Sequence, residues 1–146
     1  MSNVAAILQA HPRPVITVSP QASTIHAAQL MNGEHIGALV VVDNQRVLGI
    51  FTERDMLNRV VAINKDPAKT TVGDVMTREP ICARPDSTRA ECEAVMRRRR
   101  IRHLPVIDDG ELVGMISVHD LLEDMAHEQA ETIHTLYDFM NVAWSE

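Results

Sequence analysis

Aromatic side chains are nearly absent from this sequence. Phe, Trp and Tyr together make up 3% of the 146 residues, so Val, Ile, Leu, Met and Ala must fill the core of the protein. Proteins that hold unpaired bases stack them on aromatic side chains, and binding to a phosphate backbone usually needs a basic surface. Because the net charge is −6 as well, we do not expect nucleic acid as a partner.

Cysteines and long hydrophobic runs are also scarce. Cys82 and Cys92 form neither a Cys-x-x-Cys pair nor a secreted disulfide pattern, so we expect two reduced and buried thiols. Residues 1–14 have no basic leader and too short an apolar run for a signal peptide. No run approaches the ~18 apolar residues of a membrane span. These absences predict a cytoplasmic protein without a membrane segment.

The motifs of several common enzyme classes are missing too. The sequence has no Gly-x-Ser-x-Gly motif, no His-Glu-x-x-His motif, no phosphate-loop glycine pattern and no paired glutamate motif. His127 and His134 lie seven residues apart on a predicted helix, but the pattern offers no third metal ligand. We therefore predict neither catalytic residues nor a metal site.

The sequence does contain an internal repeat. A shift of 65 positions, without a gap, aligns Pro20 with Pro85, Met31 with Met96, Ile36 with Ile101, Asp43 with Asp108, Gly49 with Gly114 and Asp55 with Asp120. Tandem copies of this kind fold as similar units that pack on one another. We predict repeat 1 at residues 14–66, a connector at 67–79 and repeat 2 at 80–126. Helical segments are expected on either side, at 1–13 and 127–146.

Each copy predicts the same order of elements, β-α-β-β-α. The β-type runs at 15–20 and 80–85 end at a proline, which cannot donate a ladder hydrogen bond. A Ser-Thr cap followed by apolar residues at helical spacing predicts a helix. Two β-type runs joined by a polar turn then predict a hairpin, and a second helix follows. A unit of about 50 residues buries too little surface alone. We therefore predict an α+β fold in which the two copies pack about a pseudo-twofold axis.

The motif that closes each repeat has two interpretations. Residues 49–55 (GIFTERD) and 114–120 (GMISVHD) both read Gly, two apolar residues, Thr or Ser, two further residues and Asp. The hydroxyl and the carboxylate fit a capping box at a helix start, although that box prefers the longer Glu or Gln. Alternatively, the hydroxyl binds a phosphate at the helix N-terminus and the carboxylate binds a ribose diol. A glycine at the strand end would let such a ligand approach the backbone.

These features resemble a known family, the cystathionine-β-synthase (CBS) domain pair or Bateman module. The resemblance rests on the tandem unit, the doubled closing motif, the strand IRHLPVID and the connector sequence VGDVMT, and it covers roughly residues 14–126. It implies a regulatory, non-enzymatic protein of the stand-alone CBS-pair type that senses energy or redox state. Such a protein would bind AMP, ADP, ATP, NAD, NADH or S-adenosylmethionine in two clefts between its repeats. The leading interpretation also includes a homodimer and an unidentified protein partner.

The resemblance further implies which residues bind the ligand. Thr52 and Ser117 would contact phosphate, Asp55 and Asp120 would take ribose hydroxyls, and two strands of each repeat would enclose the adenine. The complete expected set is Ile16, Thr17, Gly37, Ala38, Leu39, Thr52, Arg54, Asp55, Ile81, Cys82, Ala83, Arg102, His103, Leu104, Ser117, His119 and Asp120.

The two expected sites differ in charge, and a structural alternative stays open. Repeat 1 has Arg54 where repeat 2 has His119, and only the arginine is a permanent cation, so one site should prefer a more highly phosphorylated or larger ligand. The basic run 97–100 either ends a helix or contacts phosphate. In the alternative, the chain is a ligand-free dimerisation or interaction module whose motifs only cap helices and whose tail docks a partner. That tail has apolar residues at helical spacing: Ile133, Leu136, Phe139 and Met140.

Overall fold

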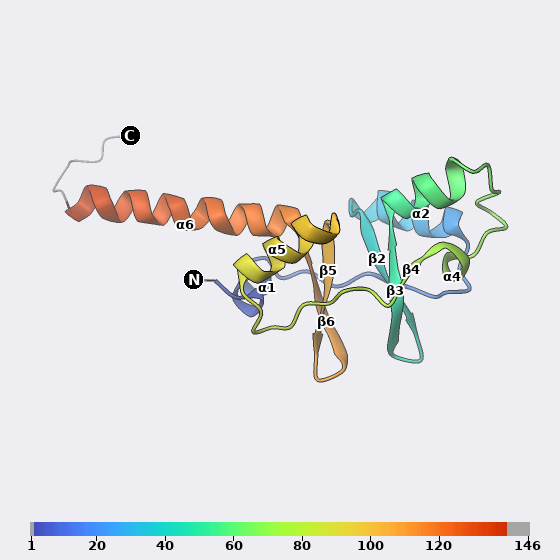
Figure 1. Ribbon diagram of the computed structural model, residues 1–146, viewed down its shortest axis with the longest axis horizontal. Helices are drawn as coiled ribbons and strands as arrows, with labels where there is room; N and C mark the ends of the chain where they lie inside the picture. The colour runs from blue at the N-terminus through green and yellow to red at the C-terminus, as the bar shows by residue number, and fades with distance from the viewer. Residues whose placement is uncertain (1, 140–146) are drawn as a thin grey trace.

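The computed structural model describes residues 2–139, with side chains for 2–136, as two α+β units side by side and a last helix that projects from one end (Figure 1). The elements in chain order are α1 (Val4–Ala10), β1 (Thr17–Val18), α2 (Thr24–Glu34), β2 (Ala38–Asp43), β3 (Arg46–Thr52), α3 (Glu53–Met56), the π-helix η1 (Leu57–Val61), α4 (Val72–Val75), β4 (Thr77–Arg78), α5 (Arg89–Arg99), β5 (His103–Asp108), β6 (Glu111–Ser117) and α6 (Val118–Phe139). The predicted α+β class with a tandem repeat is confirmed.

A β-hairpin forms the centre of each unit. β2 pairs antiparallel with β3, and β5 pairs with β6 in the corresponding register, so that Val40 faces Ile50 and Pro105 faces Met115. Both hairpin turns have two consecutive residues at positive φ, at positions 44–45 and 109–110. This backbone geometry is that of a type I′ turn, whose twist matches the flanking strands. The hairpins predicted from the sequence are therefore present in both repeats.

The first strand of each repeat is shorter than the sequence predicted. Residues 15–20 contribute only the two-residue β1, which lies parallel to β2. Residues 80–85 contribute only one isolated bridge, between Ala83 and Val106. Pro80 and Pro85 end this segment on both sides, and a proline donates no ladder hydrogen bond, so the pairing cannot extend. The first unit consequently has the sheet β1-β2-β3-β4, and the second has the hairpin β5-β6.

The short helices α1 and α4 each pack into the other unit, not into the repeat that comes directly after them in the chain. α1 comes before repeat 1 in the chain, yet Val4 and Ile7 belong to the hydrophobic core of the second unit. α4 lies in the expected connector and packs into the core of the first unit through Val72. The backbone N–H of Val72 donates to Ala22, and that of Val4 donates to Ser87, both at 2.8 Å. These two bonds correspond in the pseudo-symmetry, so each unit is completed by the helix that precedes the other.

The two cores are almost entirely aliphatic, as the composition requires. Phe51 is the one aromatic side chain among the buried residues of the described chain, and it is fully buried in the first core. Leu104 and Ile116 are at the centre of the second core. Cys92 is buried there, but Cys82 is exposed, so the expectation of two buried thiols was wrong for Cys82. Pro80 and Pro85 keep that segment out of a regular strand, which leaves Cys82 at the surface.

The last helix continues well beyond the second unit. α6 runs without a break from Val118 to Phe139, so the expected tail is a continuation of the helix that follows β6 (Figure 1). Ile133 and Leu136 are 50% and 54% exposed on its projecting half; Met140 lies outside the described residues. Across the described part of the chain, no helix combines the length and the hydropathy that a membrane crossing requires.

Candidate functional site

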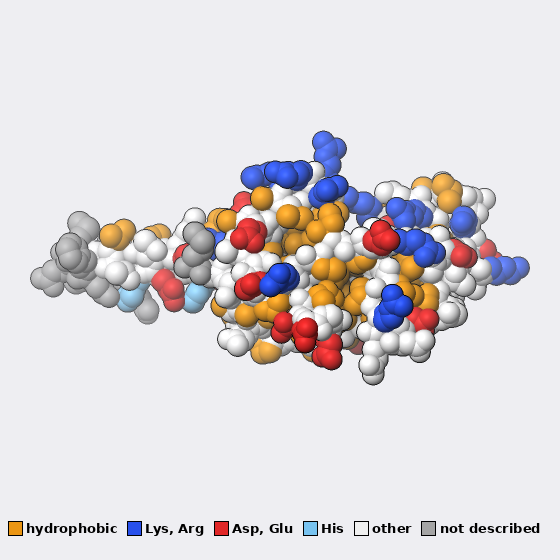
Figure 2. Space-filling model, turned by 60° about the horizontal axis from the view of Figure 1, so that its bottom comes forward, with side chains coloured by type: hydrophobic (Ala, Val, Ile, Leu, Met, Phe, Trp, Pro, Cys, Tyr) orange, Lys and Arg blue, Asp and Glu red, His pale blue; other side chains and the backbone are white. Residues whose placement is uncertain are grey.

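Two clefts lie between the repeats, and each has walls from both. Cleft A has a volume of about 540 Å³ and lies between the closing motif of repeat 1 and residues 79–81 and 99–103. Cleft B has a volume of about 460 Å³ and lies between the closing motif of repeat 2 and residues 11–16 and 35–38. The walls correspond, since 100–103 follow 35–38 by 65 positions. On the face shown in Figure 2, hydrophobic side chains gather in the middle and Lys and Arg side chains along the upper edge.

Most of the expected ligand-binding residues line these clefts. Cleft A receives Gly37, Thr52, Arg54, Asp55, Ile81, Arg102 and His103. Cleft B receives Ile16, Gly37, Ala38, His103, Ser117 and His119. Asp120 is not among the residues that line cleft B; it is buried and accepts a hydrogen bond from the backbone N–H of Ser117, which does line the cleft.

The other expected residues lie elsewhere. Leu39, Ala83 and Leu104 have their side chains in the hydrophobic cores, where they are at most 5% exposed. Thr17 is exposed on β1 and lines neither cleft. Cys82 is exposed, and its thiol donates to the Pro80 carbonyl at 3.3 Å instead of lining cleft A. Neighbouring residues of an extended segment point to opposite sides, which explains why consecutive residues cannot all face a ligand.

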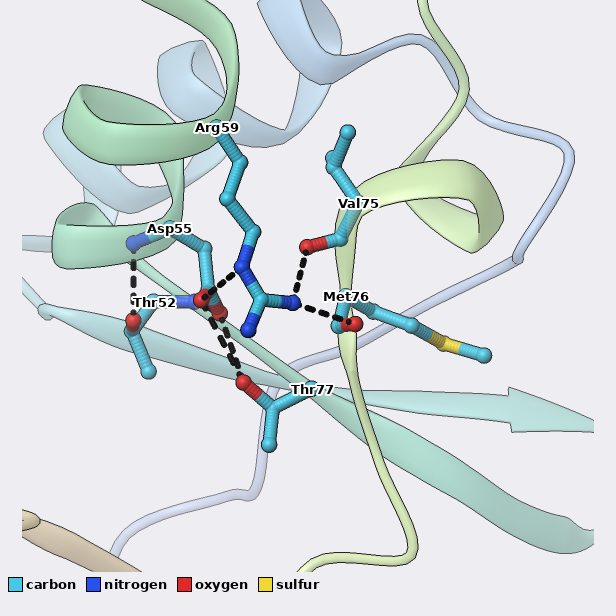
Figure 3. Close-up of polar contacts among 6 residues, drawn as sticks. All are labelled: Thr52, Asp55, Arg59, Val75, Met76 and Thr77. Carbon is cyan, nitrogen blue, oxygen red and sulfur yellow. Dashed lines mark hydrogen bonds and ion pairs between the residues drawn. The ribbon is translucent and has the colours of Figure 1, made fainter.

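The closing motif of repeat 1 forms a complete capping box (Figure 3). The backbone N–H of Asp55 donates to the Thr52 hydroxyl, and the backbone N–H of Thr52 donates to the Asp55 carboxylate, both at 3.1 Å. In repeat 2, the amide of Ser117 donates to Asp120 at 2.8 Å and the amide of Asp120 donates to Ser117 at 3.2 Å. The capping box therefore forms with Asp in both repeats, although it prefers the longer Glu or Gln, and helix capping is one role of the motif.

The Asp55 carboxylate has further partners on the floor of cleft A. It is 6% exposed, and it accepts a hydrogen bond from the Thr77 hydroxyl at 3.2 Å (Figure 3). Arg59 Nε lies 3.7 Å away, while the same guanidinium donates to the backbone carbonyls of Val75 and Met76. This network ties η1 to α4 and fixes the carboxylate. A carboxylate offers about four lone-pair positions, so a ligand hydroxyl can be added to these bonds or can replace Thr77.

The Asp120 carboxylate in cleft B has a different partner. Arg13, from the segment between α1 and β1, donates to it at 2.7 Å. His11 from the same segment and His119 from α6 both lie within ion-pair distance of Glu123, at 3.5 and 2.9 Å. Arg13 and His11 were not among the residues expected from the sequence, because residues 1–13 were predicted to lie outside the repeats. Only the crossing of α1 into the second unit brings this segment to cleft B.

The glycine of each closing motif is in contact with protein. A Cβ atom at Gly49 would lie 2.4 Å from the backbone oxygen of Thr77 on β4. At Gly114 it would lie 2.7 Å from Cδ1 of Leu8, which follows α1's core residues. The ligand interpretation expected these glycines to admit a bound molecule. Each glycine instead lies against protein: Gly49 against Thr77, which follows α4, and Gly114 against Leu8 of α1. Packing therefore explains both glycines.

His103 lines both clefts and joins them. Burial lowers the pKa of His103, and the adjacent Arg102 lowers it further, whereas Glu53 and Asp120 act in the opposite direction. The ring also lies 3.6 Å from the position of a Cβ at Gly37, which borders both cavities. A neutral imidazole at this point can donate or accept a hydrogen bond towards a ligand in either cleft.

Comparison with known sequences agrees with this arrangement. The family model of the CBS domain matches residues 7–62 and 72–127. The chain belongs to the CBS-domain family. YhcV, a CBS domain-containing protein of Bacillus subtilis, is 33% identical over 129 residues, which cover 88% of this chain and 91% of YhcV. The mitochondrial protein CBSX3 of Arabidopsis thaliana is 36% identical over 115 residues; the match covers 75% of this chain but 56% of that relative's length.

Solved structures of CBS pairs have the same fold. A putative signal-transduction protein with CBS domains from Burkholderia ambifaria is 39% identical, with a TM-score of 0.85 over 88% of this chain and 96% of that one. A CBS domain protein from Pyrobaculum aerophilum, solved with AMP, is 25% identical with a TM-score of 0.75, covering 86% and 99% of the two chains. A CBS pair solved with 5′-methylthioadenosine and S-adenosylmethionine is 28% identical, with a TM-score of 0.78, covering 88% and 98%. The tandem CBS resemblance is confirmed.

Proposed function

We propose that this CBS pair is a regulatory sensor that binds an adenine nucleotide in clefts A and B. The observation that carries the proposal is that each cleft joins the closing motif of one repeat to the strand and preceding segment of the other. A ligand that bridges these walls holds the repeats at one relative angle. When the ligand binds one angle between the repeats more tightly than another, it increases the population of molecules with that angle. A partner that contacts both repeats can respond to this change.

The walls of each cleft suit the parts of a nucleotide. Ile81 in cleft A and Ile16 in cleft B offer an apolar surface for adenine, which suits a chain with few aromatics. The Thr52 and Ser117 hydroxyls are placed at helix starts for phosphate, and the carboxylates behind them are placed for ribose. Adenosine is the part common to AMP, 5′-methylthioadenosine and S-adenosylmethionine, the ligands of the related structures. We extend the proposal to ADP, ATP, NAD and NADH.

We propose that the protein binds its ligand without catalysing a reaction. We also propose that it is located in the cytoplasm. Every role assigned to a residue in clefts A and B is binding, and the signal is a change of shape. The two cysteines are free, and one of them is exposed, which fits a reducing compartment. An unidentified protein partner would read the ligand state, and the exposed Ile133 and Leu136 on the projecting half of α6 are the surface we propose for it.

Thermal unfolding with added ligands tests the proposal. Purified, nucleotide-stripped protein is heated with AMP, ADP, ATP, NAD, NADH or S-adenosylmethionine. Ligand at 100 times its Kd adds ~2.7 kcal/mol at one site, which for a chain of this size raises Tm by about 5–11 °C. A rise with at least one adenine compound, absent with the matching guanine compound, supports the proposal. A panel without any rise contradicts it.

The alternative is a structural dimerisation or interaction module without a small ligand. One observation favours it: both closing motifs form the two reciprocal bonds of a capping box at their own helix starts, without any bound molecule. Under this alternative, Asp55→Ala and Asp120→Ala each lower the free energy of unfolding by about 1 kcal/mol and change nothing else. Under the sensor proposal, the same variants also lose the ligand-induced rise in Tm.

We further propose a homodimer that buries the helical faces of both repeats. Leu57 on η1 and Leu122 on α6 lie 65 residues apart and are 58% and 57% exposed, and Val61 adds a further exposed apolar side chain. Grooves lie beside both helices, with volumes of about 550 and 280 Å³, and the smaller one, beside Leu122, has an almost entirely apolar surface. Because the same face is repeated, a second copy can cover both halves of it at once. Sedimentation should give a dimer, and Leu57→Glu with Leu122→Glu should give a folded monomer; a monomeric wild type would contradict this.

A further inference from the structure

The two clefts differ systematically in positive charge. Cleft A is lined by five arginines: Arg54, Arg59, Arg99, Arg100 and Arg102. A shift of 65 positions gives their counterparts: His119, His35 and Gly37, which line cleft B, and Asp124 and Glu34, which do not. At each of these positions a permanent cation is replaced by a titratable, acidic or uncharged residue. The pseudo-symmetry therefore preserves the shape of the clefts but not their electrostatics.

The arginines of cleft A come together from both repeats. Arg54 on α3 donates to the backbone carbonyl of Arg100 at the end of α5, at 2.9 Å, so its guanidinium lies against the opposite wall. Within the described residues, Arg99, Arg100 and Arg102 form no ion pair with a carboxylate. Arg59 is the exception, since it pairs with Asp55. Most of this positive charge is thus available to a ligand in the cleft.

The cations around cleft B are engaged or neutral. Arg13 pairs with the buried Asp120 at 2.7 Å. His11 and His119 share the carboxylate of Glu123. His103 borders this cleft as well, and its burial disfavours the charged form. Cleft B therefore presents little unpaired positive charge near neutral pH.

We propose that cleft A is the site for an adenosine 5′-diphosphate or triphosphate and that cleft B takes an adenosine ligand with at most one phosphate. This inference rests on the proposed function. Each further phosphate adds negative charge and acceptor oxygens, which guanidinium groups bind in bidentate pairs. Arg54, Arg100 and Arg102 line the cleft that Thr52 opens into, so a phosphate chain that begins at Thr52 meets them next. Cleft B has no comparable set.

Charge-swap variants test the assignment by isothermal titration with AMP, ADP and ATP, without added Mg²⁺. Arg54→His installs the residue of cleft B, and Arg102→Ala removes a second cation from cleft A. The matched control is Arg97→Ala with Arg98→Ala, which removes two charges from α5 outside the cleft. We expect the double cleft variant to lose about tenfold or more in ATP affinity. Its AMP affinity at cleft B should be unchanged, and the control should bind ATP within about twofold of wild type.

Three results would overturn the inference. ATP affinity could be unchanged in the Arg54→His and Arg102→Ala protein, the control could lose as much as the cleft variant, or Arg13→Ala and His119→Ala could lower ATP affinity instead. Because the cleft variant could fold poorly, His119→Arg gives an independent measurement: it should raise the ATP affinity of cleft B with cleft A intact. Wild type that binds no adenine nucleotide contradicts the proposed function itself. AMP and ATP that bind equally in every variant contradict only this assignment.

Discussion

Gly49→Ala tests the packing explanation of the closing motif. The added Cβ would lie 2.4 Å from the Thr77 backbone oxygen and 2.9 Å from the Met76 sulfur. Gly49 faces Arg78 and Ile50 faces Thr77 in the β3–β4 ladder, so the clash cannot be relieved by turning one side chain. Overpacking costs typically 1–3 kcal/mol. We expect the upper part of that range, about 2–3 kcal/mol, and a fall in Tm of about 4–12 °C.

Gly114→Ala is the matched comparison in repeat 2. There the Cβ meets the end of the flexible Leu8 side chain at 2.7 Å, which can move to another rotamer. The smaller unfolded-state entropy of Ala offsets part of the remaining strain, so we expect a loss below about 1 kcal/mol. Urea unfolding monitored by circular dichroism, with equal m-values, measures both variants. Equal losses, or a Gly49→Ala protein as stable as wild type, would refute the reasoning.

Two further predictions concern the crossed helix and the shared histidine. Ile7→Ala in α1 should lower the free energy of unfolding by about 2–4 kcal/mol, because Ile7 is 3% exposed in the second core. The control Gln9→Ala, on the exposed side of α1, should change this free energy by less than about 0.5 kcal/mol. Burial lowers the pKa of His103 in the folded protein, so the unfolded chain binds a proton at this histidine more readily than the folded chain does. The folded state is therefore destabilised as the pH falls below the ordinary histidine pKa of ~6.5. Urea unfolding at pH 7.5 and 5.5 should show a larger loss in wild type than in His103→Gln, and equal losses would contradict the assignment.

The repeated elements could be predicted from the sequence because their signals are local. Hairpins, helix caps and closing motifs are set by a few neighbouring residues, and Thr88 caps α5 much as the Ser-Thr pattern indicates. The first strands were overestimated, since the prolines around residues 80–85 limit a ladder that the apolar run alone favours. Local patterns therefore predicted which elements occur better than how far they extend.

The site could be predicted only in part. The motif residues Thr52 and Ser117 do line the two clefts, because their place at a helix start follows from the sequence. The partners of the carboxylates could not be predicted. Thr77 and Arg13 reach them only because α4 and α1 each pack into the other unit, not into the repeat that comes directly after them in the chain. Such a crossing depends on tertiary packing, for which periodicity carries no signal.

Direct measurement of ligand stoichiometry tests the central claim, that the two clefts are nucleotide sites. Cleft A prefers ADP or ATP but also admits the monophosphate, so titration of nucleotide-stripped protein with AMP to saturation should show two sites per chain. One of these sites is lost in Asp55→Ala and the other in Asp120→Ala. The double variant should bind none while unfolding cooperatively within about 2 kcal/mol of wild type. Binding that survives in the double variant, or folded wild type that binds no adenine nucleotide, would contradict the account.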